Sequence, residues 1–212
     1  MARIARVVAV GYPHHVIQRG SRRQQVFFKD DDYRFYLSLL SKECEFAGTR
    51  CWAYCLMPNH VHLVLVPSTL DGLRGAIAKP HERFARKINE RNDWRGHLWQ
   101  ARFNSFPMDE AHLVACVRYV ELNPVRARLA AAADDWEWSS ARAHLAGHDD
   151  SLVSVAPMLE LFPDWRAYLA DEDSADAHDS FRRHTKSGRP LGSKQFIARI
   201  ESLTGRQLAP RR

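Results

Sequence analysis

Two histidines separated by one residue stand at the start of an apolar run, in the segment from Leu56 to Val66 (LMPNHVHLVLV). The valines and leucines that follow predict a β-strand, and a strand turns every second side chain to the same face. We therefore expect His60 and His62 to point the same way. Such a pair indicates a metal site, although one core histidine beside one at the strand edge is an equally good interpretation of these two residues alone.

A phenol and a carboxamide lie four residues apart further along the chain, at Tyr119 and Asn123. Residues four apart share one face of a helix, and the apolar spacing predicts a helix over 110–122. If this helix packs under the histidine strand, two imidazole nitrogens, an amide oxygen and a phenol surround one site. Taken singly, Tyr119 would be a core or rim residue and Asn123 an ordinary helix stop before Pro124.

Such a set of ligands would suit Mg²⁺ or Mn²⁺, with Mn²⁺ better matched to imidazole, and open positions would remain for substrate oxygens. A tyrosine beside this cation, in a basic protein, suggests nucleophilic attack on a phosphodiester. Tyrosine holds its proton at neutral pH, so a nearby cation or base is required. Attack would link the phosphate to Tyr119 and release a hydroxyl on the other strand end. That link stores the energy of the bond and permits rejoining to a second strand.

The composition is that of a basic globular protein. The chain has 212 residues and a net charge of +6, with 45% hydrophobic and 26% charged residues. These values fit one large domain, or a domain with an appendage, and favour nucleic acid over a membrane as partner. No apolar run is long enough to cross a bilayer, and the first residues lack the apolar segment of a signal peptide. We expect a cytoplasmic protein with reduced cysteines.

A zinc site is the alternative to weigh, because two cysteines precede the histidine pair. Cys51, Cys55, His60 and His62 offer four zinc ligands within twelve residues. In an extended strand, however, the two cysteines would lie about 13 Å apart, too far for one tetrahedral ion. The other two cysteines of the chain are expected to act as small buried hydrophobic residues.

Turn signals and hydrophobic periodicity place these residues on a mixed set of elements. Strands are predicted over 6–18, with an interruption at 11–13, and over 50–56, 60–66 and 94–106. Helices are predicted over 30–46, 70–92, 110–122, 140–146 and 194–203, with two short pieces inside 152–169 and an acidic linker over 171–179. The order predicts an α+β fold in which helices cover a small antiparallel sheet. Pro80 implies a kink in 70–92 or two shorter helices.

Five blocks of the sequence, taken in order, resemble the REP-associated tyrosine transposases, which belong to the HUH single-tyrosine nucleases. The blocks are AYCLMPNHVH from Ala53, GHLWQARF from Gly96, RYVELNPVRA from Arg118, WSSA from Trp138 and GRPLG from Gly188. They are spread over nearly the whole chain. Two residues depart from the family pattern: Arg128 stands where a small residue, often glycine, is expected, and Pro80 interrupts a helix that is expected to be unbroken.

The resemblance implies an HUH fold, a central antiparallel sheet of ferredoxin-like or RNA-recognition-like character flanked by helices. It implies that His60 and His62 bind the metal, with Asn123 completing the site, and that Tyr119 is the nucleophile. It also implies that single-stranded DNA beside short palindromic hairpins is cleaved and rejoined, by a monomer or a homodimer. A catalytically inactive hairpin-binding protein of the same fold and a metal hydrolase of small phosphoesters are the alternatives.

Charge and aromatic character suggest further DNA contacts. Candidates for contacts to the DNA backbone are Arg19, Arg22, Arg23, Arg102, Arg126 and Arg128. Trp99 or Phe103 could stack on an unpaired base, or could pack in the sheet instead. Arg189 could lie in a DNA groove as part of a flexible arm, or could belong to a disordered linker. The chain then divides into a tyrosine transposase domain over 1–150, short helices and an acidic linker over 151–180, and a basic C-terminal DNA-contacting tail over 181–212.

Overall fold

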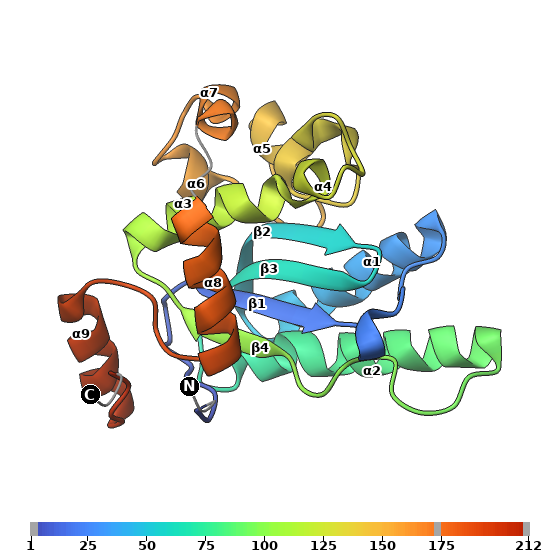
Figure 1. Cartoon of the computed structure of the whole chain (residues 1–212), viewed down its shortest axis with the longest axis horizontal. Helices are drawn as coiled ribbons and strands as arrows, with labels where there is room; N and C mark the ends of the chain where they lie inside the picture. Colours follow the sequence, from blue (N-terminus) through green and yellow to red (C-terminus); the bar gives the residue numbers. More distant parts are fainter. Residues whose placement is uncertain (1–3, 172–174, 210–212) are drawn as a thin grey trace.

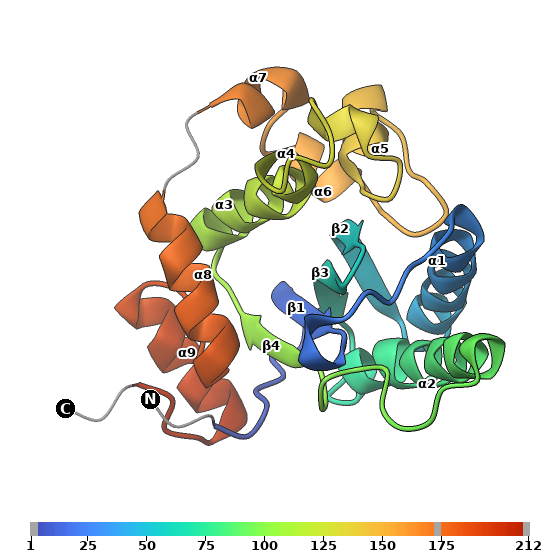
Figure 2. The ribbon, with the colours of Figure 1, turned by 45° about the vertical axis from the view of Figure 1, so that its right-hand side comes forward.

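The computed structural model describes residues 4–171 and 175–209. Within them, four strands form one antiparallel sheet in the order β2-β3-β1-β4 (Figure 1). The strands are β1 His14–Arg19, β2 Thr49–Met57, β3 His60–Pro67 and β4 Asn104–Pro107. Helices lie on both sides of the sheet, so the α+β fold predicted from the sequence is confirmed (Figure 2).

Helices account for much of the remaining chain. The longer ones are α1 Asp30–Phe46, α2 Gly72–Asn92, α3 Glu110–Glu121, α8 Ala175–Ser187 and α9 Lys194–Thr204. The short ones are α4 Asn123–Arg126, α5 Ala141–Ala146, α6 Ala156–Leu159 and α7 Trp165–Ala170, with 3-10 turns at Ser21–Arg23 and Ala133–Asp135. In the described part of the chain, no helix is both long and apolar enough to span a membrane.

The two faces of the sheet differ because successive side chains of β1 and β3 alternate between them. Val16, Val61 and Leu63 are fully buried in a core formed with α1 and α2, and we call this side the helix-pair face. His60 and His62 line a cavity on the opposite side, which we call the site face. Helices α3 and α8 cover this face (Figure 2). The same two strands thus supply an apolar core and a polar site.

The pairing of β1 with β3 determines which side chains meet on the site face. The hairpin predicted around 57–59 is present, and its turn leads directly into His60. In the adjoining ladder, Arg19 stands opposite His60 and Ile17 opposite His62. Directly opposed residues of an antiparallel pair lie on the same face. The odd-numbered residues of β1 therefore join the two histidines.

Helix α2 passes through Pro80 as one element, whereas the sequence predicted a kink or a division at this residue. Pro80 is buried, and Ala76, Ile77 and Phe84 on either side of it pack into the core shared with α1. This packing stabilises the helix along its whole length, although proline lacks the backbone N–H that would bond to the preceding turn.

The C-terminal end of α3 is anchored by Glu121, a carboxylate that is 0% exposed. It accepts hydrogen bonds from Oγ of Ser140 at 2.5 Å, Nδ1 of His144 at 2.7 Å and Nε1 of Trp165 at 2.9 Å. Charge-assisted bonds of this kind are among the stronger ones in proteins. They tie the helix that carries Tyr119 to the short helices α5 and α7.

Three segments differ from the secondary structure predicted from the sequence. The strand predicted over 94–106 is reduced to β4, because Gly96 and Ala101 adopt left-handed backbone conformations (φ 97° and 61°) that interrupt an extended strand. The strand predicted over 6–18 begins only after the turn at Gly11, where φ is 79°. The linker predicted over 171–179 contains the start of α8, which is held by the burial of Phe181.

The C-terminal segment packs on the rest of the molecule. Helix α8 lies against β4 and α3, and Phe196 and Ile200 of α9 form a small cluster with Val7 and Ala9. The basic tail predicted over 181–212 therefore begins inside a packed helix. The domain boundaries at 150 and 180 stay a prediction.

Candidate active site

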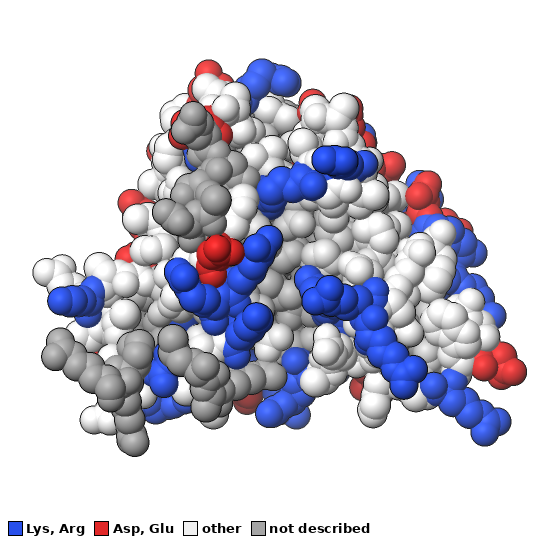
Figure 3. Space-filling view, in the orientation of Figure 1, with Lys and Arg blue, Asp and Glu red and all other residues white. Residues whose placement is uncertain are grey.

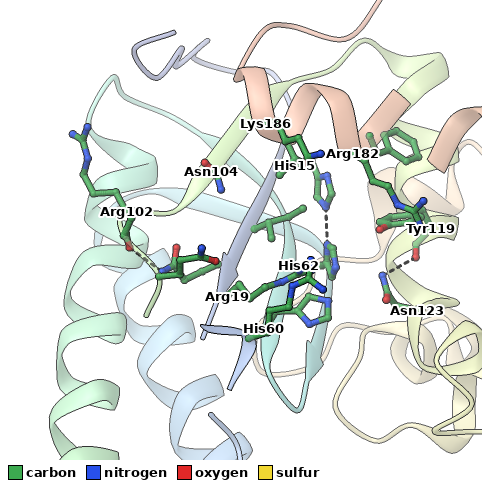
Figure 4. Close-up of a pocket in the computed structure, with 17 residues that line it drawn as sticks. His15, Arg19, His60, His62, Arg102, Asn104, Tyr119, Asn123, Arg182 and Lys186 are labelled. Atoms are coloured by element: carbon green, nitrogen blue, oxygen red, sulfur yellow. Dashed lines mark hydrogen bonds between the residues drawn. The ribbon is translucent and has the colours of Figure 1, made fainter. Parts of the chain in front are cut away.

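A cavity of about 720 Å³ opens on the site face, between the sheet, α3 and α8 (Figure 4). His60, His62, Tyr119 and Asn123 all line it, so the structure brings together the four residues singled out from the sequence. The histidines come from β3, whereas the tyrosine and the asparagine come from α3 and the start of α4 across the cavity. The cavity has the size of a typical small-ligand site, which is sufficient for a nucleotide.

Both histidines of β3 are held in the neutral form. Burial lowers the pKa of His60 to about 3, and the charge of Arg19 adds to the effect. The pKa of His62, which is 2% exposed, falls well below its usual value, again chiefly through burial. Nδ1 of His60 lies 2.6 Å from Oδ1 of Asn59, which accepts its proton and leaves Nε2 unprotonated. Neutral imidazole with an unprotonated nitrogen is the metal-binding form.

Tyr119 stands beside His62, with ring centroids 5.6 Å apart and ring planes at 87°. The guanidinium of Arg126 lies 4.5 Å from the centre of the Tyr119 ring and donates to the Tyr119 carbonyl. The amide nitrogen of Asn123 donates to the same carbonyl at 3.4 Å, so that its oxygen is the atom left for the cavity. Asn123 thus lies one helical turn beyond Tyr119, as their spacing predicts.

Helix α8 contributes part of the site that the sequence analysis did not identify. Phe181 packs against Tyr119 with ring centroids 5.3 Å apart, and His178 approaches the same ring to 5.0 Å. Arg182 and Lys186 line the cavity from this helix. Their separation by four residues was the available signal, because it places two cations on one helical face. The acidic residues just before them favoured a linker instead.

A third histidine belongs to the site and was also missed. His15 is fully buried and lines the cavity from β1, with its Nε2 3.0 Å from Nδ1 of His62. The two rings are stacked, with centroids 5.2 Å apart and planes at 12°. The sequence shows His15, Ile17 and Arg19 at alternate positions of one strand, but only the β1–β3 register shows which residues they adjoin.

Positive charge surrounds the cavity. The cations that line it are Arg19, Arg23, Arg102, Arg182 and Lys186. Lysine and arginine side chains gather around the middle of this side of the molecule (Figure 3). The first three of these arginines were predicted as DNA contacts. A cavity bordered by cations suits the phosphates of a nucleic acid.

Three of the residues predicted as DNA contacts are engaged in the protein itself. Trp99 is 7% exposed, and its Nε1 donates to a backbone carbonyl of α2 at 3.0 Å. Phe103 is likewise buried, at 6% exposure. Arg189 donates to two backbone carbonyls near the end of the chain, one of them at 2.9 Å. These contacts agree with the packing alternative for Trp99 and Phe103 and show that Arg189 holds the C-terminal segment in place, and the DNA contacts of these residues stay a prediction.

The remaining arginines from the prediction lie outside the cavity lining. Arg22 and Arg128 are exposed, and Arg126 packs on Tyr119. Arg128 has a left-handed backbone (φ 57°), a conformation that glycine adopts without strain. This conformation is the physical reason why glycine is expected at that position.

The ligand atoms present fit a divalent cation such as Mg²⁺ or Mn²⁺. His60, His62 and Asn123, which carry two imidazoles and a carboxamide oxygen, line a cavity with space for water or substrate oxygens. Among the described residues, no cluster of three or more histidine, cysteine, aspartate or glutamate side chains has the arrangement of a metal site. The zinc alternative gains no support, since Cys51 packs in the core shared with α1 and α2 whereas Cys55 packs in the separate cluster beside α3. The metal stays a prediction.

Comparisons with known proteins identify the family of this chain. The family described as "Transposase IS200 like" matches residues 9–123, more than half of the chain, and the chain belongs to this family. A curated protein of Haemophilus influenzae, whose name places it among the REP-associated tyrosine transposases, is 26% identical over 116 residues. The match covers 50% of this chain and 66% of that relative, just under two thirds of its length.

Two solved structures were also found to be similar. One is a REP-associated tyrosine transposase bound to a REP hairpin; it matches with a TM-score of 0.55 at 18% identity, over 73% of this chain and 92% of that chain. The other, a transposase structure from Deinococcus radiodurans R1, covers 56% of this chain and 95% of that chain at 20% identity, and its TM-score of 0.39 is too low to support an argument. The first match confirms the fold, and together with the family match it confirms the resemblance seen in the five sequence blocks.

Proposed function

We propose that this protein cleaves single-stranded DNA beside short palindromic, REP-like hairpins and rejoins the ends through a covalent link to Tyr119. The observation that carries the proposal is the shared cavity of His60, His62, Tyr119 and Asn123, bordered by arginine and lysine side chains. Membership of an IS200-like transposase family supports a DNA-processing role. The structural relative was bound to a REP hairpin, which supports this class of substrate.

The chain's own residues account for binding and for the transfer step. Arg19, Arg102 and Lys186 border the cavity and would hold the phosphates on either side of the scissile bond. The hydroxyl of Tyr119 loses its proton to solvent as its oxygen attacks the phosphorus and forms a P–O bond. The bond between the phosphorus and the oxygen of the departing strand breaks, and that oxygen takes up a proton from solvent and leaves as a hydroxyl. Rejoining is the same exchange in reverse, with a hydroxyl of a second strand displacing the tyrosine.

Positive charge lies close to the proposed nucleophile. The guanidinium of Arg126 is 4.5 Å from the centre of the Tyr119 ring. A divalent cation held by His60, His62 and Asn123 would supply Lewis-acid stabilisation of the phosphate oxygens.

We place the protein in the cytoplasm beside the nucleoid. The residues of the site come from one chain, so a monomer contains all of them, and light scattering distinguishes it from a homodimer.

The test is to detect the covalent intermediate directly. Labelled hairpin DNA with single-stranded flanks is incubated with the protein and Mn²⁺ or Mg²⁺ and resolved on a denaturing gel. We expect a labelled protein–DNA adduct that needs the metal and is absent in Tyr119→Phe. Tyr12→Phe is the matched control, since this tyrosine packs edge-on against Phe196, away from the cavity, and should leave the adduct unchanged.

Each alternative has its own outcome in this experiment. Hairpin binding without any adduct would indicate a catalytically inactive DNA-binding protein of the same fold. Metal-dependent turnover of a small phosphodiester that persists in Tyr119→Phe would indicate a hydrolase. An undiminished adduct in Tyr119→Phe would show that another residue is the nucleophile, and would overturn the proposed role of Tyr119.

A further inference from the structure

The histidine of β1 has a polar contact that its packing does not explain. His15 is 0% exposed and is enclosed by the rings of Phe106, Tyr119 and Phe181, at centroid distances of 5.3, 6.1 and 6.2 Å. A phenylalanine would suit such surroundings without the cost of burying polar atoms. The hydrogen bond to His62, at 3.0 Å, is the polar contact seen for this side chain in the described structure.

The neighbouring residue shows what a purely structural histidine looks like in this strand. His14 is also 0% exposed, but both of its ring nitrogens have backbone partners: Nε2 accepts from the amide of Ala9 at 3.1 Å, and Nδ1 donates to the carbonyl of Tyr12 at 2.8 Å. These bonds hold the turn before β1. In His15, by contrast, Nδ1 is buried without a hydrogen-bond partner among the described residues. Its only satisfied nitrogen is the one that faces His62.

The hydrogen bond between Nε2 of His15 and Nδ1 of His62 contains one proton, and the nitrogen that carries it decides whether Nε2 of His62 can bind a cation. A hydrogen bond between two ring nitrogens has one donor and one acceptor, so only one of the two facing nitrogens carries the proton. If Nε2 of His15 donated, His62 would hold its own proton on Nε2, and that nitrogen could not bind a cation. If Nδ1 of His62 donates, Nε2 of His62 keeps its lone pair for the cavity.

We propose that His15 is a positioning residue, whose Nε2 accepts the Nδ1–H of His62 and thereby presents the lone pair at Nε2 of His62 to a divalent cation. The inference rests on the proposed function, because it assumes that His62 is a metal ligand. His60 reaches the same state by a separate route, through the oxygen of Asn59 at 2.6 Å. Each ligand histidine thus has its own acceptor, and such partners typically fix the tautomer of a metal-binding imidazole.

The test measures metal binding instead of DNA cleavage. Mn²⁺ affinity is determined by titration with electron paramagnetic resonance for the wild-type protein, His15→Phe and His15→Gln. The phenylalanine fills the space without an acceptor, whereas the glutamine oxygen can take the place of Nε2. We expect His15→Phe to bind Mn²⁺ about 10–100-fold more weakly, the usual effect of losing such a partner, and His15→Gln to recover most of the affinity. His14→Gln is the control and should bind as the wild type does.

A second measurement uses the wild-type protein alone, and so does not depend on whether the variants fold. Imidazole ¹⁵N NMR with Mg²⁺ as the diamagnetic cation should show the proton of His62 on Nδ1. A proton on Nε2 of His62 in the Mg²⁺-bound protein, or equal Mn²⁺ affinity in His15→Phe and wild type, would overturn the role of His15 alone. Failure of the wild-type protein to bind either cation would instead overturn the metal site of the proposed function, and this inference with it.

Discussion

The two faces of the sheet present opposite environments to neighbouring residues of the same strand. On the helix-pair face, Leu63 is 0% exposed and surrounded by apolar side chains of α1 and α2. On the site face, His62 is also buried, but its neighbours are histidines, a tyrosine and a water-accessible cavity bordered by cations. Because side chains alternate along the strand, one residue of β3 can stabilise the fold while its immediate neighbour contributes to the site. Substitutions at adjacent positions should therefore have effects of different kinds.

The strongest test of this separation compares His62→Ala with Leu63→Ala. We expect His62→Ala to reduce adduct formation by at least about 100-fold, since a metal ligand is lost. Leu63→Ala should instead lower the free energy of unfolding by about 2–5 kcal/mol, because it leaves a cavity in the core. Urea unfolding and the adduct assay, expressed per folded molecule, measure both effects. If Leu63→Ala lost activity per folded molecule as severely as His62→Ala, the separation would be wrong.

A second prediction concerns the anchor of α3. Glu121→Ala would leave three buried donors without their acceptor, and we expect it to lower the free energy of unfolding by about 3 kcal/mol. Glu82→Ala, at an exposed position on α2, is the control and should change stability by less than about 0.5 kcal/mol. Thermal and urea unfolding measure both variants. A stability loss for Glu121→Ala as small as that of the control would show that the short helices do not depend on this carboxylate.

A third prediction compares the cations of α8, which border the cavity, with exposed cations of α2 on the other side of the sheet. Removing Arg182 and Lys186 together should weaken hairpin binding and reduce the slope of log K against log salt by about 1.4, or about 0.7 for each lost contact to single-stranded DNA. Arg83→Ala with Arg86→Ala removes two exposed cations from α2 and is the matched control. Fluorescence anisotropy at several salt concentrations gives both slopes. Equal slopes for the two double variants would place the DNA path away from α8.

A fourth prediction concerns acid sensitivity on the helix-pair side. Burial lowers the pKa of His14 to about 4, below its usual value of 6.5, so the unfolded chain binds this proton first. The stabilisation is therefore complete above about pH 6.5 and decreases as the pH falls toward 4. Between pH 7 and 5 the loss should be about 1–2 kcal/mol. His14→Gln should flatten the pH dependence of unfolding by this amount, and an unchanged slope would contradict the prediction.

The smallest expected effect lies in the turn after α4. Arg128→Gly should stabilise the protein by about 1 kcal/mol, because the backbone there has a φ of 57°. Ala127→Gly is the control: this residue has right-handed helical backbone angles, so glycine should destabilise the protein slightly. Differences in the melting temperature measure both variants. A destabilising Arg128→Gly would mean that the arginine side chain contributes more than its backbone strain costs.

Local patterns were sufficient to predict most elements, and together with the resemblance of the five sequence blocks they singled out four residues that the structure brings to one cavity. The hairpin before His60 and the helix carrying Tyr119 depend on turn residues and on spacing within one segment, which a sequence shows directly. The contribution of His15 depends on the register between β1 and β3, which joins segments some 45 residues apart. Local propensity contains no information about such a register.

Helix α8 was missed for a related reason. Its first turn is acidic and rich in small residues, so its composition alone favours a linker. The contacts of Phe181 with His15 and Tyr119 bury its side chain, and this burial stabilises the helix through tertiary packing. The reverse applies over 94–106, where aromatic residues suggested a strand but left-handed angles at Gly96 and Ala101 bend the chain.

The tight turn before β3 limits which insertions and deletions this chain can accept. Because strand side chains alternate with a period of two, adding or removing one residue between Met57 and His60 would shift the ladder by one position. Both histidines would then enter the apolar core, and Val61 and Leu63 would line the cavity. A change of length is therefore disfavoured in this turn, because the number of residues between β2 and β3 decides which face of the sheet receives the two histidines.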